Sequence, residues 1–150
     1  MTAILSQETL PGLIGQTIGP GDWSQVTQQR INLFAEATGD HQWIHVDEER
    51  AKAGPFGKTV AHGLLTLSMI SALNQGLFKF EGFRMGVNYG YEKIRFPSPV
   101  PVGSRLRVAA KIIDFAPAGS TFQTIVEFTV EAEGSAKPAC IAQMVFRHTP

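Results

Sequence analysis

The sequence predicts an α+β fold in which a strongly curved antiparallel sheet wraps around one long helix. Two observations carry this prediction. An apolar stretch of helical pattern runs from Ala61 to about Phe78, and the second half of the chain holds runs in which apolar and polar residues alternate. A helix that is apolar on nearly all sides is a buried one, and such runs are typical of antiparallel strands with one face in solvent. These elements can close a single core in few other ways.

The first half of the chain is predicted to be helical and looped. Thr27 offers the side-chain oxygen that suits a helix N-cap, and apolar residues at helical spacing follow it. Gly39 supplies the left-handed residue at which helices commonly end. The polar stretch 40–59 is predicted to be loop around a short helical piece near residues 47–53, because two glycines and a proline then favour a turn.

Four runs in the second half are predicted to be strands, and they cover residues 82–96, 106–115, 121–133 and 139–148. Turn-forming segments rich in glycine and proline separate the last three. A curved sheet around one helix is the hot-dog architecture. A free edge strand leaves backbone groups unpaired, so we expect a homodimer in which two sheets or two helices meet.

Composition narrows the class of protein. The chain has 150 residues, enough for one domain, and we assign residues 1–150 to a single domain. Thirteen basic residues balance thirteen acidic ones, so no overall field attracts nucleic acid. The single cysteine, Cys140, excludes an internal disulfide and fits a reducing compartment. The sequence shows no signal peptide and no membrane-spanning run, so we expect a cytoplasmic protein.

The stretch "ATGDHQWIHVD" at residues 37–47 gathers groups that can move protons. A neutral histidine has an ordinary pKa of about 6.5 and can accept a proton at neutral pH. Asp40 could instead only cap the next turn. His41 and His45 could present two ligands to a metal if they lay on a helix, but the stretch is predicted to be loop and no third ligand is apparent. We therefore expect no metal.

Taken together, "FAEATGDHQWIHVDEERA" and "FGKTVAHGLLTLSMIS" resemble the MaoC-like, (R)-specific enoyl-CoA hydratase family, especially the branch similar to nodulation protein N. The similarity runs over nearly the whole chain, including "NYGYEKIRFPSPVPVGSRLR". Asp40 and His45 match the family motif, whereas Gln42 replaces its usual asparagine and Trp43 its usual proline. These two replacements bear on the shape of the loop and on which acyl chains fit.

The resemblance implies that Asp40 and His45 are the catalytic dyad and that the Gly63 amide is the oxyanion donor. It also implies that Ser71 is an active-site polar group. We assign His45 as the base toward water and Asp40 as the proton carrier to C2, with the reverse assignment left open. Four residues form the predicted substrate-binding group: Gln42, Trp43, His62 and Ser71. For Trp43, plain loop packing is an equal alternative. A hydrogen-bonded place at the helix entry is favoured over catalysis for His62, and for Ser71 the alternative is a hydrogen bond back to the carbonyl four residues earlier.

The expected activity is hydration of trans-2-enoyl-CoA to (R)-3-hydroxyacyl-CoA, or the reverse dehydration. The alternatives are a non-catalytic protein that binds acyl-CoA or acyl carrier protein, and an acyl-CoA thioesterase. No cofactor is expected, since coenzyme A is part of the substrate. Four basic residues on the predicted strands either form a solvated face or include residues that bind the coenzyme A phosphates. They are Lys93, Arg95, Arg105 and Arg107.

Overall fold

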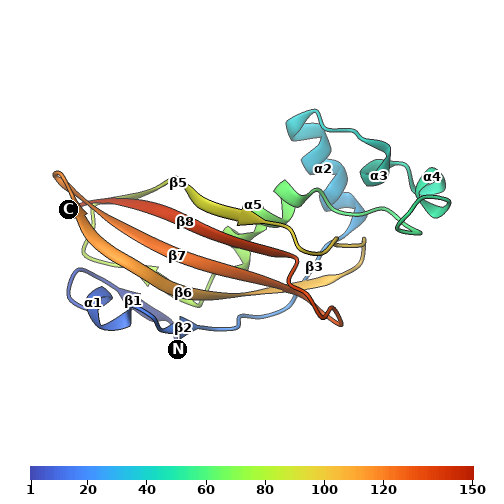
Figure 1. Ribbon diagram of the computed structural model, residues 1–150. Coiled ribbons are helices and arrows are strands. Elements are labelled where there is room, and N and C mark those ends of the chain that lie inside the picture. The colour runs from blue at the N-terminus through green and yellow to red at the C-terminus, as the bar shows by residue number, and fades with distance from the viewer.

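Four long antiparallel strands form the body of the protein in the computed structural model, which describes residues 1–150 (Figure 1). They are the four predicted strands, and they run β5 Met85–Arg95, β6 Arg105–Ala118, β7 Thr121–Ala132 and β8 Cys140–Thr149. Their order across the sheet is β6-β7-β8-β5. Two short strands, β2 Thr17–Ile18 and β3 Ser24–Gln25, pair with the outer side of β6.

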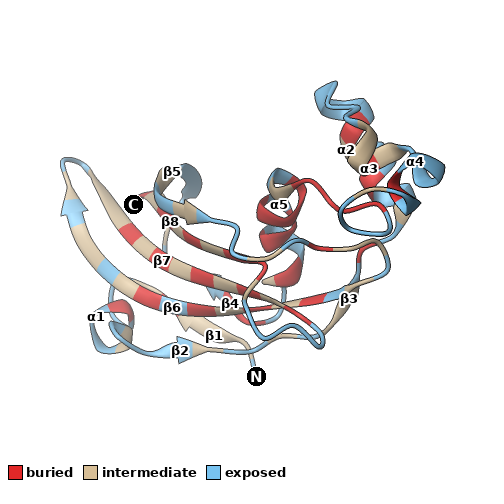
Figure 2. Ribbon diagram, turned by 45° about the vertical axis from the view of Figure 1, so that its right-hand side comes forward, coloured by how far each residue is buried: buried red, intermediate tan, exposed pale blue.

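The core lies between the sheet and helix α5, Gly63–Leu73, which contacts β6, β7 and β8. Buried positions alternate with intermediate or exposed ones along β6 and β7, as Figure 2 shows. Inward residues such as Leu106 and Val130 are fully buried. Outward residues meet solvent and pair across strands, for example Arg107 with Glu131 at 2.9 Å. This confirms the predicted curved sheet with one solvated face around a helix.

Helix α5 departs from its prediction in length and in burial. It ends at Leu73, well before Phe78, because Gly76 adopts φ +85° and turns the chain. Residues Phe78–Phe80 instead form β4, which pairs in parallel with β1, Ala3–Leu5. The helix is also not buried on all sides, because Leu64 is 59% exposed. A strip of α5 therefore stays open to solvent in the single chain.

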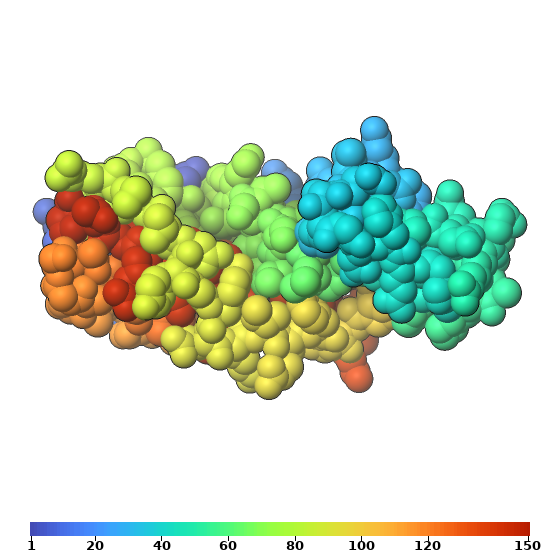
Figure 3. All heavy atoms as spheres, turned by 90° about the horizontal axis from the view of Figure 1, so that it is seen from above, coloured from blue at the N-terminus to red at the C-terminus, as the bar shows by residue number.

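A helical segment, residues 28–52, projects beyond one end of the sheet (Figures 1 and 3). It holds α2 Gln28–Thr38, α3 Trp43–Val46 and α4 Glu48–Lys52. The Thr27 hydroxyl accepts from the Arg30 amide at 3.2 Å, and Gly39 ends α2 with φ +77°, as predicted. The short helix near residues 47–53 is also confirmed, whereas the helical turn α3 stands where loop was predicted. A one-turn helix, α1, covers Leu10–Leu13, and no helix combines the length and apolar character needed to cross a membrane.

His148 is a fully buried histidine on the inner face of β8, far from the helical segment. Its Nε2 lies 3.0 Å from the Thr124 hydroxyl, and the rings of Phe80 and Phe83 lie 4.3 and 4.6 Å away. Burial lowers the pKa of His148 to about 4, because the apolar surroundings disfavour the charged ring.

We expect the stability of the protein to fall as the pH falls from about 6.5 to about 4. In that window the unfolded chain binds a proton at His148 and the folded chain does not, so protonation favours unfolding. The full loss is on the order of 3 kcal/mol. Urea unfolding at a series of pH values should give a flatter profile for His148→Phe, which keeps an aromatic ring and removes the titration. Parallel profiles for the two proteins would refute the expectation.

Candidate active site

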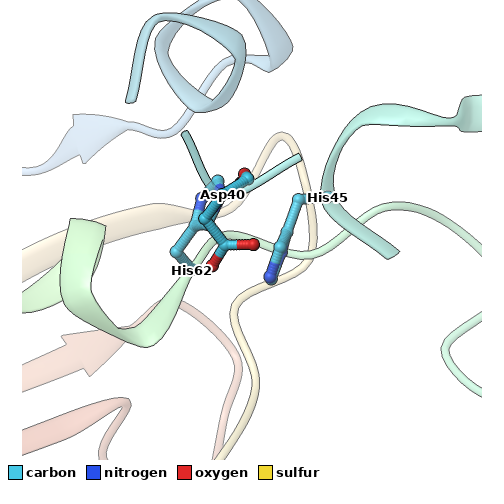
Figure 4. A group of neighbouring side chains, drawn as sticks. All are labelled: Asp40, His45 and His62. Carbon is cyan, nitrogen blue, oxygen red and sulfur yellow. The ribbon is translucent and has the colours of Figure 1, made fainter. Parts of the chain in front are cut away.

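Asp40, His45 and His62 come together between the helical segment and the start of α5 (Figure 4). One side-chain nitrogen or oxygen from each lies within 4.8 Å of those of the other two. Asp40 is exposed, whereas His45 and His62 are buried, with exposures of 7% and 3%. The structure therefore joins the predicted dyad to the histidine that precedes α5.

Local structure explains how Asp40 reaches this position. Gly39 ends α2 in the left-handed conformation, which turns the chain back toward α5. An Asp40 carboxylate oxygen then lies 3.3 Å from the Gln42 amide and so caps the turn that begins α3. The carboxylate also points toward the His45 ring (Figure 4). Turn capping and a place in the site are thus compatible roles of one side chain.

The hydrogen bonds of His45 determine which of its nitrogens is basic. Its Nδ1 lies 2.6 Å from the Val60 carbonyl oxygen. A carbonyl oxygen can only accept, so Nδ1 carries the proton and Nε2 keeps a free lone pair. The Nε2 atom can therefore take a proton from a ligand.

Two residues that sequence reasoning missed hold the backbone of His45. The Gln28 amide donates to the His45 carbonyl at 2.8 Å, and the Thr59 hydroxyl donates to Gln28 at 2.5 Å. In the sequence, Gln28 is an ordinary polar residue in the first turn of a helix, and Thr59 lies in a predicted turn. Neither has a local sequence signal, because their roles arise from contacts between distant parts of the chain.

The arrangement suits proton transfer better than metal binding. The rings of His45 and His62 are stacked, with centroids 3.8 Å apart and planes at 24°. Nε2 of His62 donates to the Asp40 carbonyl, and its other nitrogen, Nδ1, is closed to solvent, so a metal could reach only His45 and Asp40, fewer than the three protein ligands typical of a catalytic zinc site. His41, the other possible ligand, is exposed, and its Nε2 lies 3.7 Å from the Glu36 carboxylate.

Gly63 is the first residue of α5, and its N–H lies outside the hydrogen-bond ladder of the helix. No other group in the protein accepts from it. Its φ is not positive, so the close contact here is one of space: a Cβ would lie 3.1 Å from the Phe96 ring, which would have to shift slightly. Gly63 also lines a cavity of about 350 Å³ together with Phe56 and Phe96. The free amide at the positive end of a helix can stabilise a negatively charged oxygen there.

Of the other predicted site residues, Gln42 is hydrogen-bonded to this group only through its backbone, whose amide donates to Asp40, and no hydrogen bond joins the side chain of Trp43 or Ser71 to it. Gln42 is exposed at the start of α3. Trp43 packs inside the helical segment, where the Arg50 guanidinium lies 4.4 Å from the ring centre. Ser71 is exposed, about 12 Å along α5 from Gly63 at helical rise. It lines a second cavity, of about 370 Å³, with Asn74 and Phe146.

Two of the four candidate phosphate-binding residues already form ion pairs with carboxylates of the same chain. Arg105 and Arg107 pair with Glu133 and Glu131 on the outer face of the sheet, away from the dyad. Lys93 and Arg95 are exposed on β5, and neither forms an ion pair within the chain.

Comparison with known proteins places this geometry in a family. The model of the MaoC like domain matches residues 9–134, which include the dyad, His62 and Gly63. The chain belongs to the MaoC-like domain family. Among its MaoC-like relatives, 3-hydroxyacyl-thioester dehydratase Z of Mycobacterium tuberculosis is 48% identical over 149 residues, covering 99% of both chains. Nodulation protein N of Rhizobium leguminosarum bv. viciae is 46% identical over 144 residues, covering 94% of this chain and 89% of that protein.

Solved structures confirm the hot-dog fold of this MaoC-like protein. The (R)-hydratase from A. caviae superposes with a TM-score of 0.72 at 21% identity, covering 91% of this chain and 96% of that one. The monoamine oxidase regulatory protein from Archaeoglobus gives a TM-score of 0.74 at 23% identity, covering 91% of each chain.

Proposed function

We propose that this MaoC-like protein adds water to trans-2-enoyl-CoA to give (R)-3-hydroxyacyl-CoA, or catalyses the reverse dehydration. The observation that carries the proposal is the free Nε2 of His45 beside the Asp40 carboxylate, in a group whose third member, His62, directly precedes the unpaired amide of Gly63. The relative named 3-hydroxyacyl-thioester dehydratase Z, 48% identical over 99% of both chains, supports the same reaction class.

Each group has one role in the proposed hydration. A water molecule lies between the two dyad side chains, and His45 Nε2 takes a proton from it as its oxygen bonds to C3. The electron pair of the C2–C3 double bond moves toward the carbonyl, and the Gly63 N–H stabilises the resulting enolate oxygen. The proton then passes from the His45 ring to the Asp40 carboxylate and on to C2. Both residues return to their starting states, and the net change is addition of one water.

Loss of the absorbance of the conjugated enoyl thioester tests this proposal directly. Crotonyl-CoA and a longer homologue should both be assayed, each also as its acyl carrier protein thioester, and the product resolved by chiral chromatography. Consumption with the (R) product is expected. Tight binding of the thioesters without consumption would instead identify a non-catalytic acyl-binding protein, and release of free coenzyme A a thioesterase.

We further propose that the protein acts as a cytoplasmic homodimer joined at β5. This strand pairs with β8 alone, so its other edge is free over 11 residues. Three large apolar side chains are exposed along it, Met85 at 58%, Val87 at 44% and Tyr89 at 65%. A long apolar edge strand is open to pairing with a second copy. The one cysteine, Cys140, is buried and unpaired, which suits a reducing compartment.

Light scattering at micromolar concentration is expected to give twice the mass of one chain. Val87→Asp should shift the mass toward the monomer, because it places a charge among the exposed apolar side chains of the joined edge. Lys137→Asp, an exposed change outside β5, is the control and should remain dimeric. A monomeric wild-type protein would contradict the proposed assembly.

A further inference from the structure

His62 contacts both members of the dyad. Its Nε2 lies 3.0 Å from the backbone carbonyl oxygen of Asp40, and its ring stacks on that of His45 with 3.8 Å between centroids. The Phe34 ring lies 4.9 Å from it and helps to hold it in place. Because His62 is only 3% exposed, these protein groups rather than a substrate surround it.

The hydrogen bonding of His62 indicates why a histidine is present. The Asp40 carbonyl can only accept, so Nε2 of His62 carries the proton and Nδ1 is left as an acceptor. This Nδ1 is buried and has no partner. An unsatisfied buried acceptor is unfavourable, and an apolar side chain of similar size would avoid it. Such a side chain could not donate to Asp40, however, so the Nε2–H bond offers a reason for the histidine.

We infer that His62 is a positioning residue that aligns Asp40 and His45 with each other and with the Gly63 amide. Asp40 is exposed at the end of a helix, and its carboxylate makes one long hydrogen bond of 3.3 Å to the turn. The hydrogen bond from His62 holds the Asp40 backbone at the start of α5, where Gly63 is the next residue. The stacked ring limits rotation of His45, so that Nε2 stays directed at the carboxylate. This inference rests on the proposed function.

Three substitutions separate the two contacts. His62→Phe keeps a ring for stacking but removes the donor, His62→Gln keeps a donor but removes the ring, and His62→Ala removes both. We expect kcat to fall by about 10-fold in each of the first two and by about 10²-fold in the third, the scale of a small misplacement of reacting groups. KM should change little, because the His62 side chain is buried against protein groups.

His148→Phe is the matched control, since it alters another buried histidine whose contacts lie outside the site. Melting temperatures of all variants show how far each loses stability. If the His62 variants lose stability as the control does yet keep wild-type kcat, His62 is structural only and the inference is overturned.

Nitrogen NMR of the histidine rings gives a readout that needs no substrate, and only four histidines must be assigned. We expect His45 to show a single tautomer with the proton on Nδ1 in the wild type, and an averaged ring signal in His62→Ala. An unchanged His45 signal in that variant overturns the inference. A wild-type protein inactive on every enoyl thioester would overturn the proposed function, and this NMR comparison would still decide whether His62 orders the His45 ring.

Discussion

Asp40→Asn and His45→Asn are each expected to lower kcat for hydration by about 10²-fold or more, the scale of a lost general acid or base. Asp40→Asn keeps the shape of the side chain and removes the carboxylate. His45→Asn places an amide N–H near the position of Nδ1, so the bond to the Val60 carbonyl can persist while the basic Nε2 is lost. Initial rates with a saturating enoyl-CoA give the comparison.

Stability and a neighbouring variant serve as controls for the dyad. Asp40 is exposed, so its variant should melt near the wild-type temperature. His45 is 7% exposed, and a fall of a few degrees in its variant would reflect packing. His41→Ala changes an exposed histidine next to Asp40 and should keep full activity. Wild-type kcat in both dyad variants would exclude Asp40 and His45 as the acid–base pair.

Gly63→Pro is expected to lower kcat by roughly 10²- to 10³-fold relative to Gly63→Ala, the usual effect of losing one oxyanion donor. Proline at the first helical position removes an N–H that the helix does not use. The backbone can accept it, because His62 has φ −59° and ψ 138°, within the extended region that a residue before proline requires.

The alanine variant makes this comparison specific to the N–H group. Proline and alanine both add the Cβ that would lie 3.1 Å from the Phe96 ring, so both carry this contact, and only proline adds the ring carbons Cγ and Cδ. Phe96 is 42% exposed, which leaves its ring room to move aside. Circular dichroism should show that both variants keep their helix content. If the proline variant is folded and as fast as the alanine variant, another group holds the oxyanion.

Several features of this protein could be predicted from the sequence because they depend on neighbours along the chain. Thr27 begins α2 and Gly39 ends it. Both act through local features, a side-chain hydrogen bond to Arg30 and a left-handed backbone conformation. The alternation in β6 and β7 follows from the two-residue period of a strand at a core surface. The site could be suggested because two sequence features resemble the MaoC-like family. They are the spacing between Asp40 and His45 and the His-Gly pair before an apolar helix.

The end of α5 shows where the local pattern was insufficient. Leu77 and Phe78 continue the apolar run of the helix, but Phe78 belongs to β4, whose partner β1 comes from the N-terminus. The apolar pattern did not reveal this pairing, because it joins residues far apart in the sequence. The exposure of Leu64 was not predicted for a related reason. The apolar pattern alone does not show which side of α5 is left uncovered in the single chain.

The chemistry of the site was decided by tertiary contacts. The Val60 carbonyl selects the tautomer of His45, the Phe96 ring packs closely against Gly63, and His62 joins the dyad to the start of α5. Each of these contacts crosses between segments that are separate in the sequence. The sequence by itself determined which residues could move a proton and which strands could enclose a helix. Only the packing of the helical segment against Val60, just before α5, decided which nitrogen is basic, because a ring nitrogen takes its protonation from the partner that the fold places beside it.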